Sequence, residues 1–419
     1  MTRTRTQIGQ ALHFAGLDAP LALTDADALP PLIRHIMPHW PYVTRDLAQD
    51  AEPFLAVTGT EGGAFECVAN DVDGVNFQRD PVDCVCKIVA DAAWEQIRSN
   101  PLWLCLHCAA VEFAGRLVLI PNKHRAGKST LSAILAARGY KVFTDDFLPV
   151  EVGKTGEIRG RANGVAPRIR LPLPQDFSPE FQDWVKQNSG PQNKRYKYLD
   201  SSQLPEWGTA LPIGAVVILD RVDSPVPASL SDASSGDTMD VLIRQNFARI
   251  LHSGRILQAS QGVTETAELY RLNYFSAEDA ADILERHFET WQKPVREIHA
   301  PENLQREPAD IALMNMKKPR FDASAAYMRA KGATEVNVDG SIYVSDPGGL
   351  GIQKLNPISA AIWRILGIAS TAEDVAAVLM AAFPEVVDTK IRGDVIDALA
   401  KFAEKGLIGP SHQMAMAAQ

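Results

Sequence analysis

Residues 117–146 read LVLIPNKHRAGKSTLSAILAARGYKVFTDD, and this stretch decides the fold of the central part of the chain. The short, wholly apolar run 117–120 predicts a buried β-strand. Residues 128–137 predict a helix, because their apolar side chains recur on one helical face. Residues 141–143 predict another strand, which is followed by two acidic residues. Because strands and helices alternate, the sequence predicts an α/β layered fold.

The loop between the first of these strands and the helix is similar to a Walker A phosphate-binding loop, G-x-x-x-x-G-K-[ST]. Its backbone amides and the following helix N-terminus would hold a polyphosphate, with Lys128 on the β- and γ-phosphates and the Ser129 hydroxyl on Mg²⁺. Asn122 replaces the first glycine of the motif, and asparagine tolerates a left-handed backbone. Arg125 could add charge to the phosphates or point to solvent. The candidate nucleotide-binding residues are Asn122, Arg125, Ala126, Gly127, Lys128, Ser129 and Thr130.

The two acidic residues, Asp145 and Asp146, are candidate catalytic groups. Beside a phosphate-binding loop, one carboxylate can bind Mg²⁺ and another can accept the proton of an attacking hydroxyl. Adjacent strand residues point to opposite faces, so we expect the pair to divide these roles; solvated turn aspartates are the alternative. His107 lies in the predicted strand 104–113, which precedes the loop strand. It is a candidate for catalysis or phosphate contact, with a structural role as the alternative.

The length and composition of the chain exclude several classes of protein. Its 419 residues are enough for two or three domains, and 46% hydrophobic with 22% charged residues excludes a mainly disordered chain. No run of about 18 apolar residues is present and the N-terminus has no apolar signal core, so we expect a cytoplasmic protein without a membrane partner. The net charge of −9 argues against a general nucleic-acid binder, so any phosphate binding must come from a local site.

The cysteines allow two interpretations. An odd count of five, without a secretion signal, argues against a disulfide framework. Cys84-x-Cys86 and Cys105-x-x-Cys108 could together bind zinc. The first pair lies in a helical pattern and the second in an apolar strand-like run, whereas tight zinc sites usually present their ligands from turns. Reduced, packed thiols are therefore the preferred interpretation, with zinc as the alternative.

The chain is predicted to contain an N-terminal α+β region of uncertain role, a P-loop domain, a linker and a C-terminal unit, at residues 1–79, 80–296, 297–331 and 332–410. Inside the P-loop domain, the polar residues 187–197 predict a mobile loop and residues 229–237 a polar linker. Residues 240–251 predict a helix between two buried strands.

The C-terminal unit is predicted to contain three short strands followed by three helices. The first helix has Asn356 as its N-cap and Pro357 as its first residue. The second helix begins with a capping box made by Ser370 and Glu373. The third helix ends at Gly406, a residue type that commonly follows a helix C-terminus.

Three motifs occur in a fixed order: LHCAAV at 106–111, the loop at 122–130, and GYKVFTDD at 139–146. Together they resemble the HPr kinase/phosphorylase family, and more closely the shorter HPr-kinase-like proteins that modify peptides, including kinases from lasso-peptide gene clusters. The resemblance covers about residues 80–290 and implies transfer of a phosphoryl group from ATP, with Mg²⁺, to a serine hydroxyl. It also implies that Asp145 is the general base and that Asp146 binds Mg²⁺, although the two could be exchanged.

The same resemblance suggests further cationic contacts to phosphate. Residues 167–171, PRIRL, look like the strand that these relatives carry after the aspartate pair, and its two arginines could neutralise developing charge. Two arginines on a later helix could do the same, with solvated helix charge as the alternative, and a basic loop could close over nucleotide or substrate. These residues are Arg168 and Arg170, Arg244 and Arg249, and Lys194, Arg195 and Lys197.

The C-terminal unit resembles the PqqD-like family in LNPISAAIWRIL at 355–366 and STAEDV at 370–375. The resemblance covers about residues 332–409 and implies a small winged-helix-like fold that binds the leader segment of a ribosomally made peptide by strand addition. A winged helix used for DNA binding or dimerisation is the alternative. Residues 317–410 contain eleven Lys and Arg against eleven Asp and Glu, which disfavours DNA.

The sequence therefore predicts an ATP-dependent kinase that acts on a Ser or Thr hydroxyl of a ribosomally synthesised precursor peptide. The docking unit would raise the effective concentration of the tethered hydroxyl. A non-catalytic, nucleotide-binding peptide chaperone and a small-molecule kinase are the alternatives. The expected partners are the precursor or leader peptide and, as open alternatives, other peptide-modification enzymes and a second copy of the chain.

Overall fold

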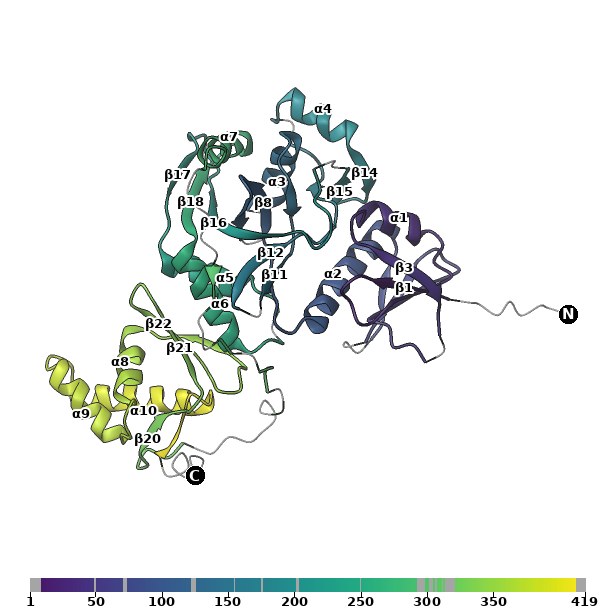
Figure 1. The fold of residues 1–419 in the computed structure, drawn as a ribbon. Helices are drawn as coiled ribbons and strands as arrows, with labels where there is room; N and C mark the ends of the chain where they lie inside the picture. Colours follow the sequence, from purple (N-terminus) through teal and green to yellow (C-terminus); the bar gives the residue numbers. More distant parts are fainter. Residues whose placement is uncertain are drawn as a thin grey trace. The chain divides into compact units, whose positions relative to one another are not determined.

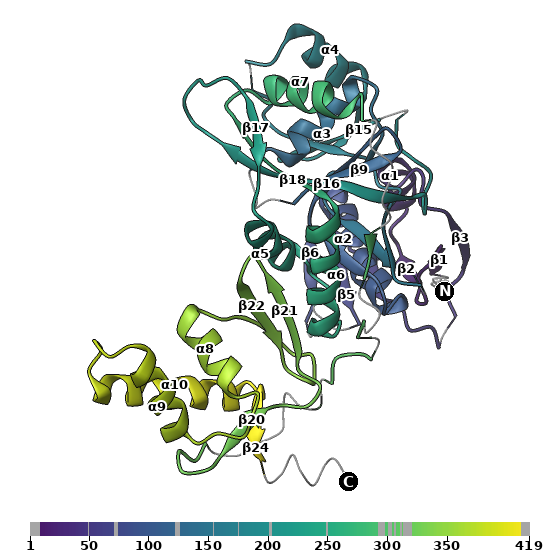
Figure 2. The same cartoon turned by 60° about the vertical axis from the view of Figure 1, so that its left-hand side comes forward.

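The structure, a computed structural model, describes residues 9–48, 50–70, 74–121, 126–153, 155–174, 176–200, 203–248, 250–291, 298–300, 304–305, 307–310, 312 and 321–411. The chain divides into two compact units, which the ribbons of Figures 1 and 2 show. The first unit comprises residues 1–233, 244–248 and 266–298, and the second comprises residues 234–243, 249–265 and 299–419.

Within the described residues, the N-terminal part of the first unit is a six-stranded sheet in the order β3-β1-β2-β4-β5-β6. Helix α2 (Pro81–Ser99) begins where it does because the Asp80 side chain accepts hydrogen bonds from the N–H groups of Val82 and Asp83. It contacts β5, β6 and helix α1 (Leu29–Ile36). The strands are β1 (Gln10–Phe14), β2 (Leu21–Thr24), β3 (Tyr42–Asp46), β4 (Leu55–Gly59), β5 (Phe65–Ala69) and β6 (Asn76–Gln78).

The cysteines are free thiols, and four of the five are buried. Cys84 of α2 lies with its Sγ atom 3.8 Å from that of Cys67 in β5. Within the described part of the chain, no three or more His, Cys, Asp or Glu side chains are grouped to hold a metal ion. The burial of four of the five thiols agrees with the preferred interpretation of packed cysteines.

The second sheet of this unit, ten-stranded over the described residues, follows the path β10-β8-β9-β16-β12-β11-β7, with β18 paired to β16, β17 to β18 and β19 to β12. Strands β9, β16 and β18 are parallel, so their carboxyl ends meet at one edge. Helices α3 (Lys128–Ala137) and α7 (Ala277–Phe288) pack together against this sheet (Figures 1 and 2). The strands are β7 (Leu104–Leu106), β8 (Ala109–Phe113), β9 (Arg116–Ile120), β10 (Val142–Thr144), β11 (Leu148–Val152), β12 (Glu157–Arg161), β16 (Ala210–Arg221), β17 (Ser229–Asp232), β18 (Glu268–Tyr274) and β19 (Ile298–His299).

Two sequence predictions for this sheet are wrong. The predicted strand 104–113 is interrupted at His107, because β7 pairs with β11 whereas β8 pairs with β9 and β10. The chain passes from one part of the sheet to another between them. The predicted polar linker 229–237 contains strand β17, which pairs with the outer side of β18. Its residues are largely exposed, so the strand lacks the apolar pattern of a buried one.

A small sheet in the order β13-β15-β14 replaces the mobile loop that was predicted at 187–197. The Asn193 side chain accepts hydrogen bonds from the N–H groups of Arg195 and Tyr196, which closes a tight turn. Tyr198 is fully buried and anchors the hairpin. The elements are β13 (Arg168–Arg170), α4 (Pro179–Gln187), β14 (Ser189–Gln192) and β15 (Tyr196–Leu199).

In the second unit, the predicted three strands correspond to β21, β22 and β23 and are followed by the predicted three helices, whereas β20 and β24 were not predicted. Asn356 caps the first helix as predicted, because its side chain accepts a hydrogen bond from the Ser359 N–H. The capping box of the second helix lies one residue later than predicted, on Thr371 and Asp374. The elements are β20 (Tyr327–Arg329), β21 (Thr334–Val338), β22 (Ser341–Ser345), β23 (Ile352–Lys354), α8 (Pro357–Ile365), α9 (Ala372–Ala382), α10 (Asp388–Glu404) and β24 (Ile408–Pro410).

Both faces of the β21-β22-β23 sheet are covered. Tyr343 of β22 packs with Met239 of helix α5 (Ser235–Gln245) and with helix α6 (Ser253–Thr266). The neighbouring side chains of β22 point to the opposite face, into the core formed by α8, α9 and α10. The predicted helix 240–251 is wrong at both ends, because the helix observed there is α5, which begins at Ser235 and ends at Gln245. Helix α6 was not predicted.

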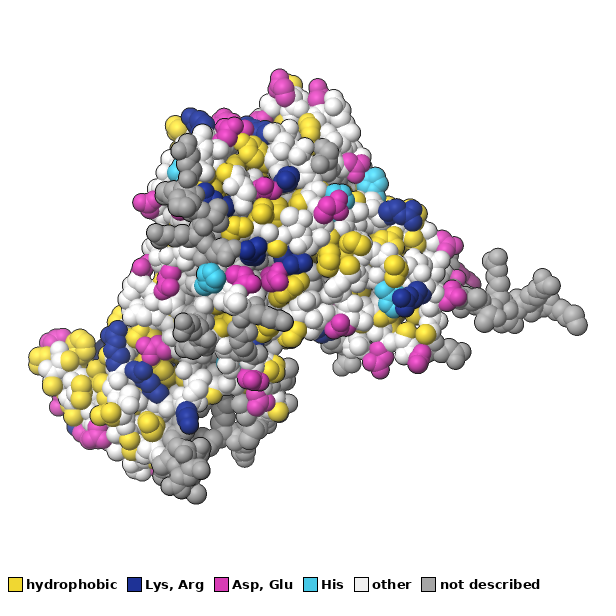
Figure 3. Space-filling view, viewed as in Figure 1, with side chains coloured by type: hydrophobic (Ala, Val, Ile, Leu, Met, Phe, Trp, Pro, Cys, Tyr) yellow, Lys and Arg dark blue, Asp and Glu magenta, His cyan; other side chains and the backbone are white. Residues whose placement is uncertain are grey.

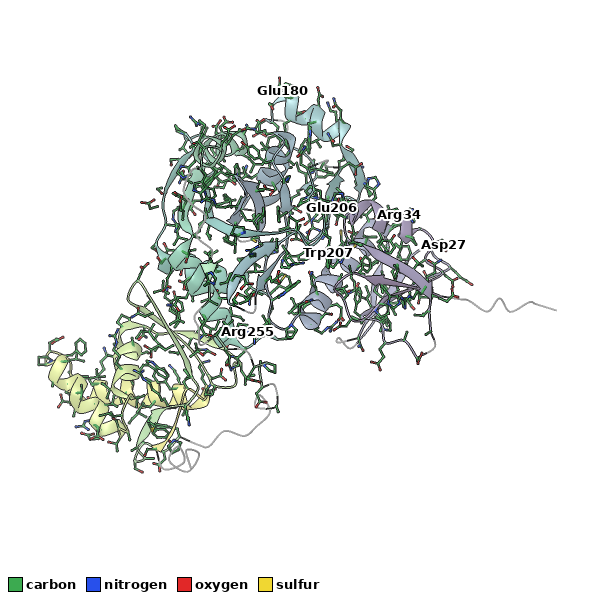
Figure 4. The ribbon with its side chains drawn as sticks, viewed as in Figure 1. Asp27, Arg34, Glu180, Glu206, Trp207 and Arg255 are labelled. Atoms are coloured by element: carbon green, nitrogen blue, oxygen red, sulfur yellow. The ribbon has the colours of Figure 1, made fainter. Side chains whose placement is uncertain are left out.

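Helix α6 is buried on most sides, including its polar residues. Arg255, labelled in Figure 4, is fully buried. Its Nε donates to the carbonyl oxygen of Gln305 at 2.6 Å, and its Nη2 donates to that of Glu307 at 3.3 Å. Because buried polar residues occur all round the helix, its sequence has no amphipathic pattern from which it could be predicted.

On the face drawn in Figure 3, acidic and basic side chains are interspersed, and hydrophobic side chains are exposed over the helical part of the second unit. The exposed apolar residues there include Ile358 of α8 and Val378 of α9, which are about half exposed, at 49% and 51%. Among the described helices, none has the length and apolar character needed to cross a membrane.

Candidate functional site

The predicted phosphate-binding loop is described from Ala126 onward; Asn122 and Arg125 lie outside the described residues. Gly127 precedes α3 with a φ of +95°, a left-handed conformation that favours glycine. A Cβ atom on Gly127 would lie 2.2 Å from the Tyr274 hydroxyl oxygen. That hydroxyl donates a hydrogen bond to the Ala126 carbonyl oxygen at 2.7 Å. The end of β18 therefore fixes the position of the loop.

The start of α3 opens into a cavity of about 300 Å³. The cavity lies at the carboxyl ends of the parallel strands, where α/β sheets commonly bind ligands. It brings together most of the candidate residues, from segments as far apart as His107 and Arg221. Its described lining is His107, Ala126, Gly127, Lys128, Ser129, Thr130, Asp145, Asp146, Arg168, Arg170, Tyr196 and Arg221.

Asp145 follows β10 and is buried, with only 6% of its surface exposed. It forms a side-chain hydrogen bond with Ser129, whereas its Oδ2 atom is buried without a hydrogen-bond partner among the described residues. Burial raises the pKa of Asp145 to about 6, and the negative charge of Asp146 also raises it, against the opposing effect of Arg168. The structure therefore holds one carboxylate that retains its proton more readily than an ordinary aspartate.

Asp146 lies in a different environment. Its Oδ2 accepts a hydrogen bond from Arg168 Nη2 at 2.6 Å, and its Oδ1 lies 3.4 Å from His107 Nδ1. The turn that carries both aspartates is held by Thr144, whose hydroxyl oxygen accepts hydrogen bonds from the N–H groups of Asp146 and Phe147. Arg168 therefore contacts both aspartates, through its backbone at Asp145 and through its guanidinium at Asp146, whereas Ser129 contacts Asp145 and His107 lies beside Asp146.

His107 occupies the break between β7 and β8. Its backbone N–H donates to the carbonyl oxygen of Gln245, the last residue of α5, at 2.8 Å. This contact, remote in sequence, lies directly after β7, and the His107 ring lies beside Asp146. The predicted position within a continuous strand is therefore wrong, although the residue lies in the cavity.

The small β13-β15-β14 sheet supplies a basic and aromatic wall. The Tyr196 ring contacts two guanidinium groups, with Arg168 at 4.7 Å and Arg170 at 5.3 Å from its centroid. Tyr196 and Arg221 were not predicted as site residues. Tyr196 lay in the supposed mobile loop. Arg221 could have been identified, because it ends the strand beside the loop strand.

The other predicted cations are not part of the described cavity lining. Arg244 on α5, and Lys194 and Arg195 at the hairpin turn, are exposed. Lys197 donates to the Ser189 hydroxyl at 3.2 Å. Arg249 lies outside the described residues.

The donor set fits a magnesium–phosphate complex. Mg²⁺ prefers oxygen ligands and usually binds through one or two carboxylates together with substrate phosphates and water. Ser129, Asp145 and Asp146 offer such oxygens, and the partnerless Oδ2 of Asp145 is a buried acceptor. Burial lowers the pKa of Lys128, an effect that nearby Cys108 and both aspartates oppose. The arrangement can therefore bind a polyphosphate beside two carboxylates.

Comparison with known proteins adds two findings. The family model described as Coenzyme PQQ synthesis protein D (PqqD) matches residues 343–408. No curated protein matches the chain. Among solved structures, the chain is similar to the Hpr(Ser) kinase/phosphatase from Coxiella burnetii, with 12% identity and a TM-score of 0.22 over 44% of this chain and 95% of that one. The predicted resemblance of the C-terminal unit is confirmed: residues 343–408 are similar to the PqqD family.

Proposed function

We propose that the chain is an ATP- and Mg²⁺-dependent kinase that phosphorylates a Ser or Thr hydroxyl of a ribosomally synthesised precursor peptide. The observation that supports it most directly is the convergence of Lys128, Ser129, Asp145 and Asp146 on one cavity at the carboxyl ends of parallel strands. Phosphoryl transfer requires such an arrangement, in which a lysine and backbone amides bind the phosphates and two carboxylates lie beside them.

Each residue has a role in this proposal. Lys128 and the amides after Gly127 bind the phosphates, and Ser129 and Asp146 would hold Mg²⁺. When bound, Mg²⁺ neutralises phosphate charge. Asp145 accepts the proton of the attacking hydroxyl as that oxygen bonds to the γ-phosphorus and the bond from this phosphorus to the β-phosphate oxygen breaks.

The assignment of the two aspartates follows from their partners. Asp146 is paired through its Oδ2 with the Arg168 guanidinium. Asp145 keeps a buried Oδ2 without a described partner. The hydrogen bond between Asp145 and Ser129 favours the exchanged assignment, which remains the alternative. His107 is a positioning residue that orients Asp146.

The second unit would hold the peptide by strand addition. Among the described residues, β23 pairs with β22 alone, so its other edge offers backbone groups to an extended peptide. Ile358 lies shortly after β23 in the sequence, is exposed on the first turn of α8, and offers the peptide an apolar contact. Docking there would raise the effective concentration of the acceptor hydroxyl.

The test uses the full chain with ATP, Mg²⁺ and the short peptide encoded beside its gene. Mass spectrometry should show the addition of one phosphoryl group to the peptide, and Lys128→Ala and Asp145→Asn should each slow this transfer by about 10²-fold or more. Lys186→Ala, a change on the exposed face of α4, is the matched control and should leave transfer unchanged. If the wild-type protein binds ATP and the peptide without transfer, the kinase proposal is wrong and a nucleotide-binding peptide chaperone is the better account.

A further inference from the structure

The segment 163–166, shortly after β12, lies against the turn that carries the two aspartates. Asn163 is buried there, with 1% of its surface exposed. Its Nδ2 donates to the Thr144 hydroxyl oxygen at 3.1 Å and to the Phe147 carbonyl oxygen at 2.8 Å, so the side chain joins both ends of that turn. Its Oδ1 accepts a hydrogen bond from the Val165 N–H at 3.0 Å, which fixes the orientation of the amide.

The Thr144 hydroxyl connects Asn163 to the aspartates. Its oxygen accepts hydrogen bonds from the N–H groups of Asp146 and Phe147, as described above, and also from the Asn163 amide. Both aspartates line the phosphate cavity, whereas Asn163 is not part of its described lining. Asn163 can therefore act on the reaction only through the turn that it holds.

The same segment is bound on its other side by the N-terminal region. The Ala166 N–H donates to the carbonyl oxygen of Ile36, the last residue of α1, at 2.8 Å, and the Gly164 carbonyl oxygen accepts a hydrogen bond from the His39 N–H at 3.3 Å. Gly164 has a φ of +71°, and a Cβ atom on it would lie 2.7 Å from the carbonyl carbon of His39. Such a close approach of two backbones requires glycine.

A second contact secures this junction immediately before Asn163. Trp40, which is fully buried, stacks on Trp207 with 6.4 Å between the ring centroids, and Figure 4 labels Trp207. The next residue, Gly208, donates its backbone N–H to the Ala162 carbonyl oxygen at 3.0 Å. The backbone on both sides of Asn163 is therefore tied, directly or through Trp207, to the N-terminal region.

We propose that Asn163 is a positioning residue for phosphoryl transfer, and that the N-terminal region acts through segment 163–166 to hold Asp145 and Asp146 in place. This inference rests on the proposed function, which gives the two aspartates their roles. It also assigns a role to the N-terminal α+β region, for which the sequence indicated none. A misplacement of about 1 Å at a reacting group can slow a reaction by about 10²-fold. Loss of the Asn163 amide should therefore slow transfer while both substrates still bind.

Steady-state kinetics on the full chain, with ATP, Mg²⁺ and the short peptide encoded beside its gene, test this inference. Asn163→Ala should lower kcat by about 10²-fold and leave the KM values for ATP and peptide unchanged. Thr144→Val, which keeps the side-chain shape but has no hydroxyl, should lower kcat too, whereas Thr144→Ser should retain most of it. Asn188→Ala is the matched control: it removes an amide that donates to the Trp184 carbonyl oxygen at 2.8 Å, and it should change neither kcat nor KM.

The link to the N-terminal region has a variant of its own. Gly164→Ala places a side chain against the His39 backbone and should lower kcat in the same way, again without a change in KM. A wild-type kcat in a folded Gly164→Ala protein would show that the N-terminal region does not hold the aspartates.

The outcomes distinguish this inference from the proposed function. Circular dichroism checks that each variant is folded, and if Asn163→Ala is not, the two Thr144 variants decide. A wild-type kcat in folded Asn163→Ala, or in Thr144→Val, overturns the inference and leaves the kinase proposal standing. A raised KM with an unchanged kcat overturns it too, because the effect would then be on substrate binding. If the wild-type protein transfers no phosphoryl group, the kinase proposal is wrong and this inference is overturned with it.

Discussion

The P-loop sheet and the β21-β22-β23 sheet present different parts of a β-sheet to their surroundings. In the first, parallel strands end together, and charged side chains from several of them line one cavity. In the second, antiparallel strands are covered on both faces, and β23 has one edge without a described partner. The first suits side-chain chemistry, and the second suits recognition through backbone hydrogen bonds.

The largest expected effect separates these two roles. Lys128→Ala should slow phosphoryl transfer by about 10²- to 10³-fold, because the buried cation that the proposed function places on the phosphates is lost. Peptide affinity, measured by fluorescence anisotropy, should stay unchanged. An equal loss of peptide affinity would contradict the division between the two sheets. The exposed Lys186→Ala variant serves as the control.

The backbone of the phosphate loop should be nearly as sensitive. Gly127→Ala should weaken nucleotide binding by about tenfold or more, because it forces a side chain into a left-handed conformation and against Tyr274. Adding Tyr274→Phe removes the contacting oxygen and should recover part of the affinity. Gly393→Ala in α10, where a Cβ meets nothing within 4 Å, is the control and should not alter binding. A fully active Gly127→Ala protein would refute this account of the loop.

Substitutions in β23, at the edge of the β21-β22-β23 sheet, should have an intermediate effect, and this effect should be on peptide binding. The variants replace Ile352, Gln353 or Lys354 with proline, one position at a time. Where the replaced backbone N–H points away from β22, the substitution should weaken peptide binding about tenfold, because proline has no N–H to donate to the peptide. Phosphoryl transfer at saturating peptide should be unchanged in that variant. Equal peptide affinity in all three folded variants would show that the peptide does not pair with this strand.

The smallest effect concerns stability alone. Thr371→Ala removes the N-cap of α9 and should lower the free energy of unfolding by about 1 kcal/mol. Chemical denaturation measures this change, and transfer activity at low temperature should not differ from the wild-type protein. Ser370→Ala, at the residue that the sequence predicted as the cap, tests the corrected assignment. This substitution leaves the capping box of Thr371 and Asp374 intact.

The regions that the sequence predicted well are those specified by nearby residues. The strand at 117–120 and helix α3 follow from local periodicity, and Gly127, Lys128 and Ser129 from a contiguous motif. The break at His107 could not be predicted, because it depends on a hydrogen bond to Gln245. The aromatic wall at Tyr196 depends on a hairpin that tertiary packing stabilises. Such features have no local signature.

Helix α5 has a consequence for how this chain can be divided. The PqqD-like match begins at residue 343, yet Tyr343 lies against Met239 of α5, about a hundred residues earlier in the sequence. A gene fragment beginning after residue 320 would therefore encode a sheet with one apolar face uncovered, which favours aggregation. We therefore expect that the PqqD-like segment does not fold stably by itself, and that a fragment containing it must also contain residues 234–265.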